Sequence, residues 1–357
     1  MRFPVVVLLL TSLATSPGAA QALRGRLVAA DSVTPVSGAL VLLQDSAGRT
    51  IDKSVSSDGG RFQLRSTVPG HFTLRVLRIG YAPWESEVAL ASGQTLDRSL
   101  LLADARIALP EIQVEGAQLC GARAEGDSVG SLLWGQAGTA LSLANEAIRS
   151  RQYRFGTVLE ERLVDSTGML SRRLPISNLD AVNTAWPIRS LPPDSLLRYG
   201  FILNREDLVE GPTWYGPDAE FLLSDSFMAG HCFRTVPPGA GFPPEWIGLA
   251  FEPAAKSRLA DVRGTVWLDR ASAELRRIDY QYTQLPSWAR GRDALGSLTF
   301  VSLHDGGWVV QRWFMRVPVP KVDAVTGQAG FFGYREWGGH VAEVLSPTGE
   351  VIQRFES

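Results

Sequence analysis

The sequence predicts a mainly β protein in two parts, a small β-sandwich followed by an antiparallel curved sheet packed with a helix. Short runs of alternating apolar and polar residues, separated by turns rich in Gly, Pro and Asp, fill most of the chain and are typical of antiparallel strands. One long stretch, residues 128–149, instead repeats apolar residues at helical spacing. The 357 residues exceed what a single core usually serves, which favours two domains.

Residues 1–22 have the pattern of an export signal. Arg2 precedes the apolar run FPVVVLLLTSLA, and the segment closes with the small-residue site Ala20-Gln21-Ala22, so we expect the mature chain to start at Leu23. No later run reaches the roughly 18 apolar residues of a transmembrane helix. We therefore expect an exported protein without a transmembrane span, located in the periplasm or outside the cell, with outer-membrane association as a further option.

Residues 23–103 are predicted to form the β-sandwich. Their apolar runs are separated by corners such as Asp58-Gly59-Gly60 and Val68-Pro69-Gly70, where Gly supplies positive φ and Asp bonds its own backbone. In the run HFTLRVL, Phe72, Leu74 and Val76 alternate with polar residues and share one face of a strand. The segment therefore has the local chemistry of a hairpin-rich domain.

The same corners carry a family resemblance. The series Pro35-Val36-Ser37-Gly38-Ala39, Asp58-Gly59-Gly60-Arg61-Phe62, Val68-Pro69-Gly70 and Ile79-Gly80-Tyr81 occurs in this order along the segment. It resembles the carboxypeptidase regulatory-like domain, a transthyretin-like β-sandwich. The resemblance implies a non-catalytic appendage, for which carbohydrate binding is suggested by fold analogy.

Residues 104–126 are predicted to be a linker, and residues 127–357 a helix plus an antiparallel β domain. The helix carries an apolar stripe, formed by Leu133, Ala137, Ala140, Leu141, Ala144 and Ile148. The hairpin at residues 264–282, GTVWLDRASAELRRIDYQY, is similar to a repeat unit of the half-barrel in periplasmic lipoprotein carriers. That resemblance implies a curved sheet around the helix and a hydrophobic ligand, such as an acyl chain, in this domain.

Cys120 and Cys232 are the two cysteines of the chain. An even number in an exported protein favours a disulfide, with two buried thiols as the alternative. The 35 basic and 37 acidic residues give a net charge of -2, which argues against nucleic acid as a partner. The glycine clusters all fall at turns rather than in a phosphate-binding loop or a dinucleotide fingerprint, so no cofactor is expected.

Two short patterns resemble active-site motifs. His340 and Glu343 have the spacing of two zinc ligands, but no His follows them, and a strand would place the pair on opposite faces, so no metal site is expected. GDSVG, residues 126–130, fits a nucleophile elbow at Ser128, but no apolar strand precedes it and helix capping is favoured. We expect no catalytic residues, and a serine hydrolase using Ser128 is the alternative.

The densest group of aromatic and polar residues lies in residues 214–233. The candidate ligand-binding residues there are Trp214, Tyr215, Asp218, Asp225 and His231. The competing interpretation is a loop held in place by the disulfide. The sequence thus predicts a non-catalytic protein of the cell envelope that binds a hydrophobic ligand or an envelope protein partner. Carbohydrate binding and a purely structural scaffold are the alternatives.

Overall fold

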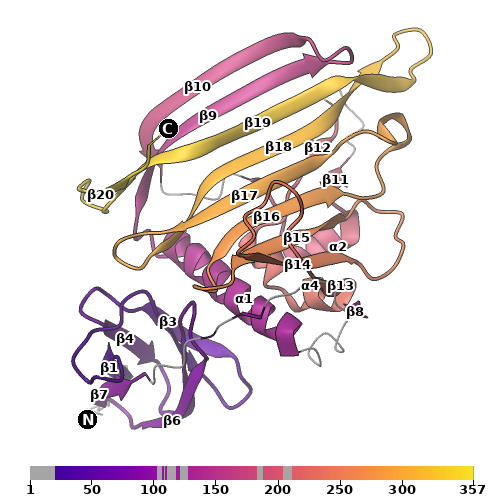
Figure 1. Ribbon diagram of the computed structural model, residues 1–357. Coiled ribbons are helices and arrows are strands. Elements are labelled where there is room, and N and C mark those ends of the chain that lie inside the picture. The colour runs from indigo at the N-terminus through magenta and orange to yellow at the C-terminus, as the bar shows by residue number, and fades with distance from the viewer. Residues whose placement is uncertain are drawn as a thin grey trace, which may run out of the picture.

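The computed structural model describes residues 21–102, 107, 109–110, 118–120, 128–182, 188–203 and 211–356. Most of the expected export signal and linker lies outside these residues. The fold class is confirmed: two small sheets precede a large antiparallel sheet with a long helix (Figure 1). No helix among the described residues is long and apolar enough to cross a membrane.

The first domain is a sandwich of a three-stranded and a four-stranded sheet, ordered β4-β1-β7 and β3-β2-β5-β6. Its strands are β1 (Gln21–Val28), β2 (Leu40–Gln44), β3 (Thr50–Val55), β4 (Arg61–Ser66), β5 (Gly70–Leu77), β6 (Trp84–Leu90) and β7 (Thr95–Leu101). Phe72, Leu74 and Val76 all face the core between the sheets, as their alternation predicts. Strand β1 begins at Gln21, two residues before the expected mature start at Leu23.

The second domain is built on one large sheet, ordered β10-β9-β19-β18-β17-β16-β15-β14-β13-β8, with β20 also paired to β19. Its strands are β8 (Leu119–Cys120), β9 (Arg154–Asp165), β10 (Leu170–Val182), β13 (His231–Val236), β14 (Trp246–Pro253), β15 (Val262–Asp269), β16 (Leu275–Tyr282), β17 (Leu295–Ser302), β18 (Trp308–Val322), β19 (Ala329–Leu345) and β20 (Val351–Arg354). Neighbouring strands are antiparallel throughout, as expected for hairpin connections.

Helix α1 (Ser128–Arg149) lies under the face of this sheet formed by β13 to β18 (Figure 1). Its predicted apolar stripe is buried against the sheet, with Leu133, Ala137 and Leu141 fully covered. Smaller elements fill the rest of this side: α2 (Pro193–Tyr199), the β11–β12 pair (Ile202–Leu203 and Thr213–Trp214), α3 (Ala219–Leu222), α4 (Asp225–Gly230) and η2 (Ser287–Ala289). The helix side of the sheet is therefore a packed core rather than an open barrel interior.

The two domains are joined by a packed interface. On β2, Val41 and Leu43 face the sandwich core, whereas Leu40 and Leu42 pack against the core of the second domain. The four-stranded sheet therefore faces α1, and the three-stranded sheet lies on the far side of the sandwich (Figure 1).

Polar contacts fix the same interface. Gln136 of α1 is buried, its Oε1 accepts a hydrogen bond from the Gly80 amide at 2.6 Å, and its Nε2 donates to the Tyr81 carbonyl at 3.1 Å. Lys53 Nζ lies 2.5 Å from Glu146 Oε2. Since both pairs join residues far apart in sequence, they fix how the sandwich sits on the helix.

Candidate functional site

The predicted disulfide is confirmed. Cys120 of β8 pairs with Cys232 of β13, and the two residues lie directly opposite each other in the antiparallel ladder. The bond ties the two-residue strand β8 to the edge of the large sheet and closes a sequence separation of 112 residues. It holds down the end of the segment that sequence reasoning singled out for ligand binding.

The aromatic residues of that segment lie in or beside the core. Trp214 on β12 is only 7% exposed, and its ring meets the Tyr282 ring edge-on at 5.2 Å. Tyr215 is half-buried, and its carbonyl accepts a hydrogen bond from the Tyr282 hydroxyl at 2.7 Å. Both residues therefore pack against β16, where they help to anchor the β11–β12 pair.

The polar residues of the segment make local structural contacts. Asp218 caps α3 by accepting a hydrogen bond from the Phe221 amide at 2.8 Å, and burial raises the pKa of its carboxyl. Asp225 is exposed in the first turn of α4. His231 is 3% exposed and lies between two carbonyls, with Nδ1 3.0 Å from Phe227 O and Nε2 3.2 Å from Val262 O. The five candidates thus occupy separate structural positions, and their role in ligand binding stays a prediction.

The alternative active site begins at the N-terminus of α1. Ser128 is the first residue of that helix, in agreement with the capping interpretation at the level of the backbone. Its side chain lies outside the described part of the structure, so the hydrolase hypothesis stays a prediction. Among the described residues, no group of three or more His, Cys, Asp or Glu is arranged to hold a metal ion.

A hollow of about 660 Å³ lies on the other face of the large sheet, away from α1. The register of β17, β18, β19 and β9 places its residues in rows across the strands. One row runs Thr299, Arg312, His340 and Val158, and the next runs Ser297, Phe314, Gly338 and Glu160. Because Gly338 has no side chain between Phe314 and Glu160, the surface is open at this point.

Apolar groups form much of the lining. Phe314 is 36% exposed, which is unusual for a large aromatic side chain. Val158 lies on the same face, and Leu159, Trp313 and Trp337 border the hollow although the register places their side chains on the helix side of the sheet. A Cβ at Gly338 would lie 2.8 Å from the Trp313 carbonyl oxygen, so glycine is required where β18 and β19 approach here.

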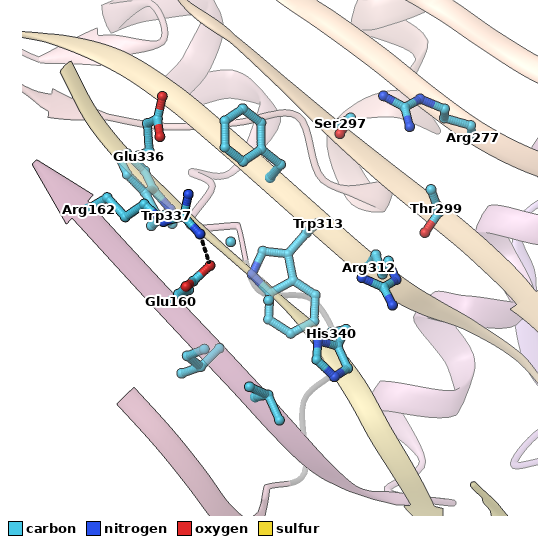
Figure 2. A pocket seen from close by; sticks show the side chains of 15 residues that line it. Glu160, Arg162, Arg277, Ser297, Thr299, Arg312, Trp313, Glu336, Trp337 and His340 are labelled. Atoms are coloured by element: carbon cyan, nitrogen blue, oxygen red, sulfur yellow. Dashed lines mark hydrogen bonds and ion pairs between the residues drawn. The ribbon is translucent and has the colours of Figure 1, made fainter. Parts of the chain in front are cut away.

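One end of the hollow carries polar groups with free hydrogen-bonding capacity (Figure 2). Arg312 is exposed and makes no hydrogen bond or ion pair with any residue that the structure describes. The buried Oγ1 of Thr299 also has no hydrogen-bond partner among the described residues. Partial burial, and then the positive charge of Arg312, lower the pKa of His340. This end of the hollow therefore presents hydrogen-bond donors and a positive charge without a counter-charge among the described residues.

The remaining charges of the hollow are paired. Arg162 binds Glu160 at 2.7 Å, as the dashed line in Figure 2 shows, and Arg316 lies 3.3 Å from Glu336. Arg277 is paired with Asp279 at 2.7 Å. Net attraction for an anion is therefore concentrated at Arg312, and the neighbouring imidazole of His340 can serve as a hydrogen-bond donor.

A second hollow, of about 370 Å³, lies where the β11–β12 pair meets β18 and β19. Trp214 and Trp337 line it together with Val317 and the prolines of β18. Its two arginines are Arg189 and Arg335, and Arg335 is 3.5 Å from Glu161. Trp214 is the member of the predicted set that reaches this hollow.

Sequence reasoning missed the larger hollow because its residues come from five strands, which lie in separate parts of the chain. Composition within a short window detects dense clusters such as residues 214–233, whereas these side chains occur singly. One local feature was available: Gly338 and Gly339 interrupt the strand pattern after Trp337. Glycines inside a strand mark a bulge or a close approach by backbone or ligand.

Comparison with known proteins identifies the first domain. Residues 22–103 form a carboxypeptidase regulatory-like domain. This confirms the resemblance seen in the turns, and the match begins one residue before the predicted boundary. The family covers the sandwich and does not extend into the large sheet. No curated protein matches the chain.

Solved structures give only distant similarity. The minor pilin of Streptococcus agalactiae is 15% identical, over 28% of this chain and 48% of the pilin, with a TM-score of 0.22. The chain thus spans about half of that pilin. The major pilin subunit of Bacillus cereus is 11% identical, over 95% of this chain and 93% of the pilin, with a TM-score of 0.21. Similarity at this level supports no inference about function.

Proposed function

We propose that this is a non-catalytic, exported protein of the cell envelope that binds a hydrophobic ligand bearing an anionic group. The observation that carries the proposal is the exposed guanidinium of Arg312, which has no described partner and lies one row from Phe314 and Gly338. A charged group without a counter-charge beside an open apolar surface is the arrangement expected of a ligand site.

The hollow has a charged region and an apolar region, which fit two different parts of one ligand. The Arg312 guanidinium offers a planar set of donors suited to a carboxylate or phosphate, and His340 can add a further donor. Phe314 and the backbone at Gly338 provide an apolar surface for the ligand body. The carboxylates of Glu160 and Glu336 are already paired with arginines, which favours binding over acid–base catalysis.

The helix side of the sheet offers less room for such a ligand. There the side chains of α1, α3 and α4 pack against the strands, with Phe221 and Phe227 fully buried and their rings 5.3 Å apart. The proposal therefore keeps the hydrophobic ligand that the sequence predicted and moves it to the opposite face of the sheet.

Titration with decanoate by isothermal calorimetry tests the proposal. Arg312→Gln removes the free charge, and we expect roughly a tenfold or greater loss of affinity, because hydrogen bonds to charged groups contribute about 1.5–3 kcal/mol. Arg258→Gln, at an exposed arginine outside the hollow, is the matched control and should bind like the wild type.

Two results would contradict the proposal. The first is equal binding of decanoate by the Arg312→Gln and Arg258→Gln variants. The second is equal affinity of the wild type for decanoate and decyl maltoside, which would show that the anionic group is not recognised. Native mass spectrometry of the exported protein then identifies a ligand that co-purifies with it.

A further inference from the structure

The outer face of the three-stranded sheet in the first domain is rich in arginine. Strand alternation places Arg24 and Arg26 of β1 outward while Leu23 and Leu27 enter the core. The same alternation on β4 places Arg61, Gln63 and Arg65 outward. We call these four arginines, Arg24, Arg26, Arg61 and Arg65, the arginine face.

The register brings these side chains together. Arg26 lies directly opposite Arg61, and Arg24 lies opposite Gln63 on one side and Asp97 of β7 on the other. Directly paired residues have Cβ atoms about 5 Å apart, and residues two apart on one strand are separated by about 7 Å. The guanidinium groups therefore form a close array on one surface.

Among the described residues, few carboxylates offset the charge of this array. All four arginines are exposed, and none takes part in an ion pair among the described residues. Arg26 Nε donates a hydrogen bond to the Gly59 carbonyl at 3.1 Å, which does not neutralise its charge. Asp97 is the single carboxylate in the sequences of β1, β4 and β7, and Asp52 of β3 accepts a hydrogen bond from the Arg65 amide at 2.6 Å.

Folding does not account for such a face. Like charges directly opposite each other destabilise a sheet, as at Arg26 and Arg61. The face is also not covered by the second domain, because the other sheet of the sandwich packs on α1 (Figure 1). A wide, open hollow of about 750 Å³ runs over it, lined by Arg24, Arg26, Arg61 and Arg98.

We propose that the arginine face docks on the surface of a membrane rich in anionic phospholipid. Clustered basic side chains are attracted to anionic headgroups, and each adds to the attraction until salt screens it. The outward residues of these strands include no aromatic side chain, the usual platform for stacking a sugar ring. A flat, charged face of this kind fits adsorption to headgroups without insertion.

Co-sedimentation with vesicles tests the proposal. The exported protein is mixed with vesicles of phosphatidylcholine alone, or of phosphatidylcholine with phosphatidylglycerol, at low and high salt. We expect binding only to the anionic vesicles, and loss of that binding at high salt. Replacing Arg24, Arg26, Arg61 and Arg65 together by Gln should lower the partition coefficient by roughly tenfold or more, since each arginine contributes to the attraction.

The control makes the same change of charge elsewhere. Arg258, Arg290, Arg292 and Arg354, exposed arginines of the second domain, are together replaced by Gln. This variant should sediment like the wild type, and far-UV circular dichroism should show that both variants are folded.

Equal loss of binding in the two variants would overturn the proposal, because total charge and not the arginine face would then be responsible. Binding to polygalacturonate without binding to anionic vesicles would overturn it in favour of an acidic polysaccharide. The Arg312→Gln variant should bind vesicles normally, so failure of the ligand proposal and failure of this one can be told apart.

Discussion

Gly338 shows how one residue opens a site in a continuous sheet. Its neighbours across the strands, Phe314 and Glu160, point to the same face, and the missing side chain between them leaves the floor of the hollow. Arg312 and Thr299 then supply polar atoms without described partners at one end. Buried polar groups are normally paired, so the buried Thr299 Oγ1 is an exception that a bound ligand would explain.

His340 gives a pH-dependent prediction at this scale. Burial and Arg312 lower its pKa below the ordinary value of about 6.5, so the free protein disfavours the imidazolium and loses stability as the pH falls below that value. A bound carboxylate favours the imidazolium and raises the pKa of His340. Decanoate affinity should therefore increase several-fold between about pH 8 and pH 6.

Calorimetry at a series of pH values measures this effect. His340→Gln keeps a polar side chain but cannot titrate, and its affinity should be nearly constant over the same range. The other charged groups of the hollow are Glu160, Arg162, Arg277, Arg312 and Glu336. If the variant keeps the pH profile of the wild type, the profile does not come from His340 and the prediction is wrong.

At the scale of elements, a β-bulge decides which side chains of β18 meet the core. Thr299 pairs with Arg312 but Phe300 pairs with Val310, so Gln311 is an extra residue. Simple alternation groups Val309 with Trp313 and Val310 with Phe314. The bulge reverses this, placing Val310 on the Trp313 face and Val309 on the Arg312 face. Arg312 and Phe314 lie beyond the bulge, and their side chains share the face of the sheet that carries the hollow.

The disulfide is the second feature of this scale. Replacing Cys120 and Cys232 together by Ala should lower the free energy of unfolding by about 2–5 kcal/mol, because the long loop of the unfolded chain is no longer closed. Urea unfolding measures the change. The reduced wild type should match the double variant, whereas a wild type that reductant leaves unchanged would show that the bond contributes little.

At the scale of the whole molecule, the sandwich and the large sheet share an interface across α1. Replacing buried Gln136 by Leu leaves the Gly80 amide and the Tyr81 carbonyl without partners, which should destabilise the protein by about 1–3 kcal/mol. The exposed residue Gln281 provides the control, as Gln281→Leu. Calorimetry should show one transition in the wild type and earlier melting of the sandwich in Gln136→Leu. If Gln136→Leu and Gln281→Leu had the same melting temperature, Gln136 would not stabilise the interface between the domains.

The sequence by itself determined the features that depend on neighbouring residues. Turn chemistry identified the sandwich at residues 23–103, periodicity located the helix at 128–149, and two cysteines predicted one bond. In each case the physical cause acts within a few residues, or the number of possible partners is one.

Only the tertiary structure revealed the hollow of the large sheet and the arginine face. The hollow joins side chains from β9, β16, β17, β18 and β19, and the arginine face joins β1 to β4, so both depend on strand register. Register is set by long-range pairing, and a shift of one residue would move every side chain to the opposite face. Spacing along the chain does not contain that information, so the sequence pattern pointed instead to the cluster at residues 214–233.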